Sequence, residues 1–165
     1  MRIPLSALVA AGLLTSHLAA AQCVHPTDSA AFDVTGLKSQ LMVTALTCNA
    51  TERYNAFIVK YRPDLVSQDR SLHGYFSRAY GRSATKRHDD YITQLANSQS
   101  QNGVTQGTLF CGRNMAIFDE VMALRGGSEL PDFAAAKAGT QPVSLTGCGA
   151  APERATTRSP ARRRS

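Results

Sequence analysis

The chain has 165 residues, of which 43% are hydrophobic, 7% aromatic and 18% charged, with 18 Lys and Arg against 12 Asp and Glu. This balance is typical of a globular protein and excludes a collagen-like or wholly disordered chain, and the length suits one domain. The formal net charge of +6 would fit a nucleic-acid-binding protein, so the position of the basic residues decides whether that class remains open.

The first 21 residues have the pattern of a secretory signal peptide. Arg2 supplies a positive charge, an apolar run covers residues 5–18, and three alanines precede Gln22 as the small residues of a cleavage site. The apolar run is shorter than the roughly 20 residues that a membrane helix needs, so we expect no transmembrane anchor after cleavage. The pattern predicts a bacterial protein that is exported to the periplasm or outside the cell.

Helices are predicted through most of residues 22–149, because apolar residues recur at steps of three, four and seven. The connections between them are short, and helices joined in this way pack as antiparallel neighbours. We therefore expect an all-α fold, a small up-and-down antiparallel bundle of four to five helices. The expected helical segments are residues 33–48, 49–61, 62–80, 83–102, 105–125 and 129–137, the first two being either separate or one kinked helix.

Some ends and faces of these helices are predicted in more detail. Asn49, followed by Glu52 three residues later, resembles a capping box that begins the second segment. Asn102 and Gly103 are expected to end the fourth helix. The fifth helix has the clearest apolar stripe, formed by Cys111, Met115, Phe118 and Met122.

The last segment, residues 150–165, contains two prolines, several small polar residues and no apolar side chain larger than alanine. Such a segment cannot bury enough surface to offset the entropy of ordering, so we predict a disordered tail. Five basic residues and one acidic residue lie in this tail, and one basic residue lies in the signal peptide, which leaves 12 basic and 11 acidic residues in 22–149.

The expected folded domain, residues 22–149, therefore carries a net charge of only +1. Because most of the positive charge lies in the tail of an exported chain, nucleic acid is not an expected partner. Arginine clusters suit phosphates and other anions, so Arg162, Arg163 and Arg164 are candidates for anion binding.

Four cysteines, Cys23, Cys48, Cys111 and Cys148, lie in the exported part of the chain. An even number in an oxidising compartment predicts two disulfides. Cys48 and Cys111 lie on apolar sides of expected helices, which favours Cys48 with Cys111 and Cys23 with Cys148. The sequential pairing, Cys23 with Cys48 and Cys111 with Cys148, remains the alternative. Zinc-binding and redox motifs place two cysteines close together in the sequence, and this spacing does not occur here.

The remaining residues that could carry chemistry give weak signals. Asp69 and His73 are four apart and could share a helix face, and His88 could meet an acidic neighbour from another helix. We interpret these residues as ion-paired, solvated helix surface, and we predict no metal site and no cofactor. The sequence has no H-E-x-x-H, G-x-S-x-G or phosphate-loop pattern.

The leading functional prediction is a non-enzymatic exported helical protein, a binding or structural module of the cell envelope. Its partner would be an envelope protein, a peptide or an anionic polymer. The alternative is a small exported, hydrolase-like enzyme whose site is assembled from His88 and scattered carboxylates. The carboxylates considered for that role are Glu52, Asp119, Glu120 and Glu129.

Overall fold

The computed structural model describes residues 24–137 and 141–142, and its regular elements are all helical, which confirms the all-α prediction for this part of the chain. Two short 3₁₀ turns, η1 (Gly81–Ser83) and η2 (Gly127–Glu129), precede α4 and α6. The α-helices are α1 (Pro26–Thr47), α2 (Thr51–Lys60), α3 (Arg62–Tyr80), α4 (Ala84–Gln106), α5 (Leu109–Ala123) and α6 (Leu130–Ala136).

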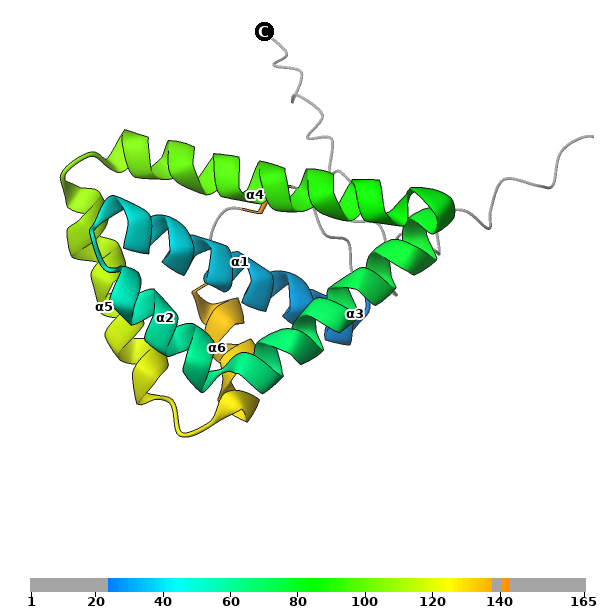
Figure 1. Ribbon diagram of the computed structural model, residues 1–165, viewed down its shortest axis with the longest axis horizontal. Coiled ribbons are helices and arrows are strands. Elements are labelled where there is room, and N and C mark those ends of the chain that lie inside the picture. The colour runs from blue at the N-terminus through cyan, green and yellow to red at the C-terminus, as the bar shows by residue number, and fades with distance from the viewer. Residues whose placement is uncertain (1–23, 138–140, 143–165) are drawn as a thin grey trace, which may run out of the picture.

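Helix α1 is the centre of the fold. It packs against each of the other five α-helices, and Figure 1 shows it crossing the interior of a roughly triangular frame outlined by α3, α4 and α5. Contacts with five helices bury most of the circumference of α1, while Lys38, Met42 and Leu46 remain exposed along one line of the helix. The arrangement is thus a central helix with others around it rather than a row of neighbours. The buried apolar residues of α1 are Ala31, Phe32, Val34, Leu37, Leu41, Val43 and Ala45.

Two hydrophobic clusters lie along α1. The first, which we call the α5-side core, joins the C-terminal half of α1 to α2, α5 and α6. The second, the α4-side core, joins the start of α1 to α3 and α4. The α5-side core contains Val34, Leu37, Leu41, Ala45, Ala50, Phe57, Tyr61, Ile117, Phe118, Val121, Leu130 and Ala134. The α4-side core contains Val24, Ala31, Phe32, Leu72, Tyr75, Phe76, Tyr91 and Leu95.

Several helix ends differ from the sequence prediction. Helix α1 begins at Pro26, seven residues before the expected start, because proline is favoured in a first turn, where it has no hydrogen bond to lose. Helix α4 continues through Gly103 and ends at Gln106, before Gly107, whose positive φ of 55° is a conformation that glycine adopts most readily. Helix α5 consequently begins at Leu109 rather than near residue 105.

The predicted capping box at the start of α2 is wrong. Asn49 has a φ of 55° and lies in the turn between α1 and α2, while the residue that precedes α2 is Ala50. A left-handed residue at this point turns the chain, and asparagine tolerates it better than most other residues. Asn49 therefore belongs to the turn between α1 and α2 and does not cap α2.

The buried face of α5 is also displaced from the predicted stripe. Met122 is exposed, and the buried residues are Phe110, Asn114, Ile117, Phe118 and Val121. Lys60 donates hydrogen bonds to the carbonyls of Met122 and Leu124, at 2.7 and 2.9 Å. These bonds satisfy carbonyls that are left without an intrahelical partner at the end of α5.

A disulfide between Cys48 and Cys111 joins the end of α1 to the first turn of α5, with 5.7 Å between the two Cα atoms. This confirms the favoured partner of Cys48 and shows that the sequential pairing is wrong. Cys23 and Cys148 lie outside the described residues, as do the expected signal peptide, the expected tail and Arg162–Arg164. No helix in the described ranges is both long and apolar enough to cross a membrane.

Candidate functional site

Three residues that could ligate a metal meet where α3 packs against α4. Asp69 and His73 lie one turn apart on α3, and His88 lies in the second turn of α4. One ligand atom from each residue lies within 4.8 Å of those from the other two. The imidazole rings of His73 and His88 are stacked with 4.0 Å between centroids and 25° between planes. We call these three residues the α3–α4 cluster.

His88 is the fixed member of the α3–α4 cluster. It is 8% exposed, and the ring of Phe76 meets it edge to face, with 5.5 Å between centroids. Its Nδ1 lies 3.3 Å from a carboxylate oxygen of Asp89, and its buried Nε2 has no hydrogen-bond partner. A buried polar atom left unpaired costs about 1–3 kcal/mol, so this nitrogen is a place where the bare fold loses stability.

Asp69 and His73 are the exposed members, with side chains that are 55% and 51% exposed. The His73 Nε2 atom is 3.8 Å from an oxygen of Asp69, a loose ion-pair distance that a small rotation of either side chain would change. The α3–α4 cluster thus combines one buried imidazole with an exposed imidazole and an exposed carboxylate. Two imidazoles and one carboxylate form a donor set that can hold a divalent transition-metal ion.

The sequence analysis interprets Asp69, His73 and His88 as ion-paired, solvated helix surface, with Asp69 and His73 on one helix face. Lys86, Arg87 and Asp89 are indeed exposed, but His88 is buried against α3, so its interpretation as solvated surface is wrong. The helical spacing of Asp69 and His73 was visible in the sequence. The meeting with His88 depends on how α3 crosses α4, which no local pattern specifies.

The carboxylates considered for an enzymatic site do not gather around His88. Asp119 pairs with Arg53 at 3.0 Å, Glu120 with Lys137 at 2.5 Å, and Glu129 with Arg125 at 2.8 Å. Hydrogen bonds from the backbone N–H and the guanidinium of Arg125 lower the pKa of Glu129 below its usual value. The acidic residue that the fold brings to His88 from another helix is Asp69.

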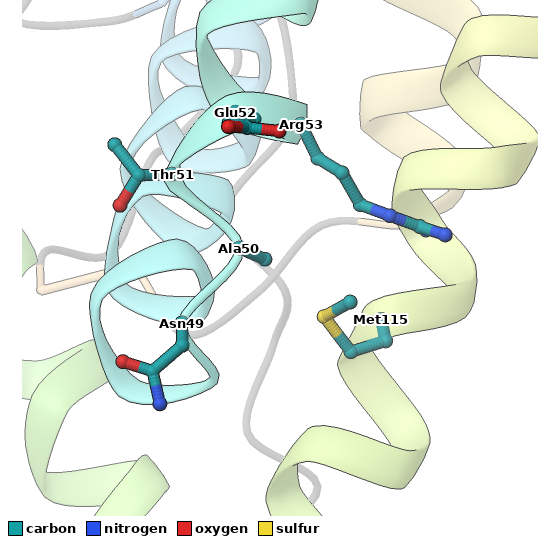
Figure 2. A pocket seen from close by; sticks show the side chains of 6 residues that line it. All are labelled: Asn49, Ala50, Thr51, Glu52, Arg53 and Met115. Atoms are coloured by element: carbon teal, nitrogen blue, oxygen red, sulfur yellow. The ribbon is translucent and has the colours of Figure 1, made fainter.

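A second candidate site is a surface hollow of about 520 Å³ where the α1–α2 turn faces α5. Figure 2 shows that Arg53 reaches toward α5, while Asn49 and Thr51 point away from Met115. The polar side chains therefore diverge, whereas acid–base catalysis needs groups that converge on one reacting atom. Its lining residues are Asn49, Ala50, Thr51, Glu52, Arg53 and Met115.

Polar contacts also extend along the α4-side core. The Tyr91 hydroxyl donates a hydrogen bond to Gln141 at 2.9 Å, and the Gln141 amide donates to the carbonyl of Phe32 at 3.1 Å. Burial raises the pKa of Tyr91 well above its usual value, and the nearby Asp33 carboxylate adds to the effect while the hydrogen bond with Gln141 opposes it. These contacts hold Gln141 against α1 and α4.

Comparison of the chain with protein-family models, with curated proteins and with solved structures gives no match.

Proposed function

We propose that this protein is exported and acts as a non-enzymatic helical binding module in the bacterial periplasm or outside the cell. The observation that carries the proposal is the disulfide between Cys48 and Cys111, which joins two helices of the folded body. Disulfides persist in oxidising compartments and are rare in the bacterial cytosol. The signal-peptide pattern of residues 1–21 supports the same destination.

The proposal includes a second disulfide between Cys23 and Cys148. With Cys48 and Cys111 joined, these two are the remaining pair in the sequence. Gln141 is hydrogen-bonded to Phe32, and the chain from Phe32 back to Cys23 spans at most about 20 Å. The segment from Gln141 to Cys148 can extend to about 23 Å, so it is long enough to close this bridge.

The proposed partners are an envelope protein, a peptide or an anionic polymer. The described body offers a nearly balanced charge, while the basic residues of 150–165 offer an anion-binding segment in Arg162, Arg163 and Arg164. Electrostatic binding through such a segment is weak and falls as salt is added. A tail that engages polyanions would hold the compact helical body near an anionic surface.

Export and cross-linking are tested together by expressing the full chain in a bacterium and fractionating the cells. We expect the protein in the periplasm or medium, a mature chain that begins at Gln22, and two disulfide-linked peptide pairs in a non-reduced digest. A chain that stays in the cytosol with residues 1–21 attached and with free thiols would contradict the proposal.

The binding role is tested with immobilised heparin as the polyanion and with an envelope extract. We expect the full-length protein to be retained on heparin at low salt, and the variant with Arg162, Arg163 and Arg164 changed to serine to be eluted earlier. A matched control changes Arg53, Arg113 and Arg125 of the body to serine. If the tail variant and the body variant are retained equally on heparin, any anion binding lies outside the tail. If the protein retains no component of the envelope extract, this counts against a binding role.

A further inference from the structure

We propose that Asp69, His73 and His88 form a binding site for one divalent transition-metal ion between α3 and α4. This inference goes beyond the proposed function, because it names a ligand class and a site, and it does not depend on export. It rests on the described geometry of the α3–α4 cluster, in which three metal-ligating side chains from two helices lie within 4.8 Å of one another.

The unpartnered nitrogen of His88 supports a metal site. The carboxylate of Asp89, 3.3 Å from Nδ1, favours the tautomer in which Nδ1 carries the proton. The Nε2 lone pair is then free, and it is buried without a hydrogen-bond partner. A carboxylate on the far nitrogen of an imidazole is the arrangement that orients metal-bound histidines in proteins. Asp89 would therefore act as a positioning residue for His88.

The exposure of the other two ligands also supports a metal site. Metal–nitrogen and metal–oxygen bonds of about 2.0–2.2 Å require the three donor atoms to approach more closely than they do in the bare fold. His88 is held by Phe76, so the approach has to be made by Asp69 and His73, whose side chains are about half exposed. The required change is a rotation of these two side chains about their own bonds, with the helices left in place.

The donor set indicates the class of ion. Imidazole nitrogens suit Zn²⁺, Cu²⁺ and Ni²⁺, whereas Mg²⁺ and Ca²⁺ prefer sites made wholly of oxygen ligands. Three protein ligands leave at least one coordination position to water, because these ions take four or more ligands. The exposure of Asp69 and His73 places that open position at the protein surface, where a partner could complete the coordination.

The test is isothermal titration calorimetry of the mature full-length protein with Zn²⁺, followed by the same titration with Mg²⁺. We expect one Zn²⁺ per chain and no binding of Mg²⁺ at the same concentrations. The variants His73→Gln and Asp69→Asn remove one ligand each from exposed positions and should weaken Zn²⁺ binding by at least about tenfold. Their circular-dichroism spectra should match that of the wild type, since neither side chain is part of a hydrophobic core.

Matched controls separate this site from binding elsewhere on the chain. His25→Gln removes an exposed histidine outside the cluster, and Asp119→Asn removes an exposed carboxylate that pairs with Arg53. Both controls should bind Zn²⁺ as the wild type does. The proposal is overturned if the wild type binds no Zn²⁺, if His73→Gln binds it equally well, or if His25→Gln abolishes binding.

A structural readout completes the test. Bound Zn²⁺ links α3 to α4 across η1, so it should raise the melting temperature of the wild type and leave that of His73→Gln unchanged. In nuclear magnetic resonance spectra, the ring signals of His73 and His88 should shift together on addition of Zn²⁺ while those of His25 stay in place. Shifts confined to His25 would contradict the proposed site.

Discussion

The two cores on either side of α1 are held together by different kinds of interaction. The α5-side core is a largely aliphatic cluster beside the disulfide of Cys48 and Cys111. In the α4-side core, the Phe32 ring meets Tyr75 and Tyr91 edge to face, with centroid distances of 5.0 and 5.1 Å. Hydrogen bonds, an ion pair and the α3–α4 cluster surround these rings.

The two cores therefore differ in how strongly a bound ligand or a change of protonation can alter their stability. On the α5 side, a covalent link and aliphatic packing predominate, and the buried Tyr61 hydroxyl and Asn114 amide donate hydrogen bonds to the carbonyls of Val121 and Phe110. On the α4 side, Asp28 is buried and accepts two hydrogen bonds from Arg78, and His88 keeps an unpaired nitrogen. Buried polar groups are the ones whose protonation or ligation changes the free energy of a fold, so a ligand has most to act on there.

The largest expected effect comes from removing the link on the α5 side. Changing Cys48 and Cys111 to alanine opens a loop of 63 residues, and the loop-entropy argument gives a loss of about 4 kcal/mol in the free energy of unfolding. Urea unfolding of the mature protein measures the loss. Hydrogen exchange should report faster opening of α5 than of α4, and equal acceleration on both sides would contradict the division between the two cores.

A smaller effect is expected from the ion pair of the α4 side. The side chain of Asp28 is 4% exposed, while that of Arg78 is 55% exposed, with 2.7 Å between their charged atoms. Arg78→Met leaves a buried carboxylate without its cation, and we expect a loss of about 2 kcal/mol, reduced from the cost at a fully buried pair because water reaches Arg78.

A double-mutant cycle provides the control for this pair. Asp28→Asn combined with Arg78→Met should recover part of the lost stability, because the uncompensated charge is then absent. If the double variant is as unstable as the two single losses added together, the pair contributes nothing beyond packing.

The smallest effect concerns Asp33, whose pKa is raised by burial, with an opposing hydrogen bond from Ser29. Because the folded state binds this proton more tightly than the unfolded state, the contribution of Asp33 is fully favourable below its unfolded pKa and is lost as pH rises through its folded pKa. Asp33→Asn should therefore stabilise the protein at neutral pH, by less than about 1 kcal/mol because the group is partly solvated.

Urea unfolding at two pH values tests the sign of this effect. The advantage of Asp33→Asn over the wild type should be present at neutral pH and disappear in acid, where the wild-type carboxyl is protonated as well. The substitution should also lower the pKa of Tyr91, since the Asp33 carboxylate contributes to raising it. An advantage that persists unchanged in acid would show that Asp33 acts through packing and not through its charge.

Helix positions illustrate how far sequence patterns reach in this protein. The boundary between α2 and α3 lies where residues 49–61 and 62–80 are expected to meet, because Pro63 restricts its own backbone and that of Arg62. The end of α4 was misplaced because Asn102 and Gly103 resemble a helix end, and a second glycine four residues later, Gly107, is the one that adopts the left-handed conformation. Two adjacent signals of the same kind cannot be ranked without the packing around them.

The candidate site illustrates the opposite case. Asp69 and His73 are related by one helical turn, so a sequence pattern finds them. His88 belongs to another helix, and its burial depends on the ring of Phe76 and on the crossing of α3 and α4. The disulfide was easier to predict, because four cysteines allow only three pairings and burial favoured one of them.

The sequence by itself determined the helical class, most of the helix boundaries, the near neutrality of residues 22–149 and the favoured partner of Cys48. These properties depend on residues close together in the chain or on small sets of alternatives. Only the tertiary structure decided that α1 lies at the centre, that Gln141 returns to Phe32, and that His73 stacks on His88. The physical reason is that packing between helices is set by the shapes of many side chains at once, and no local spacing encodes it.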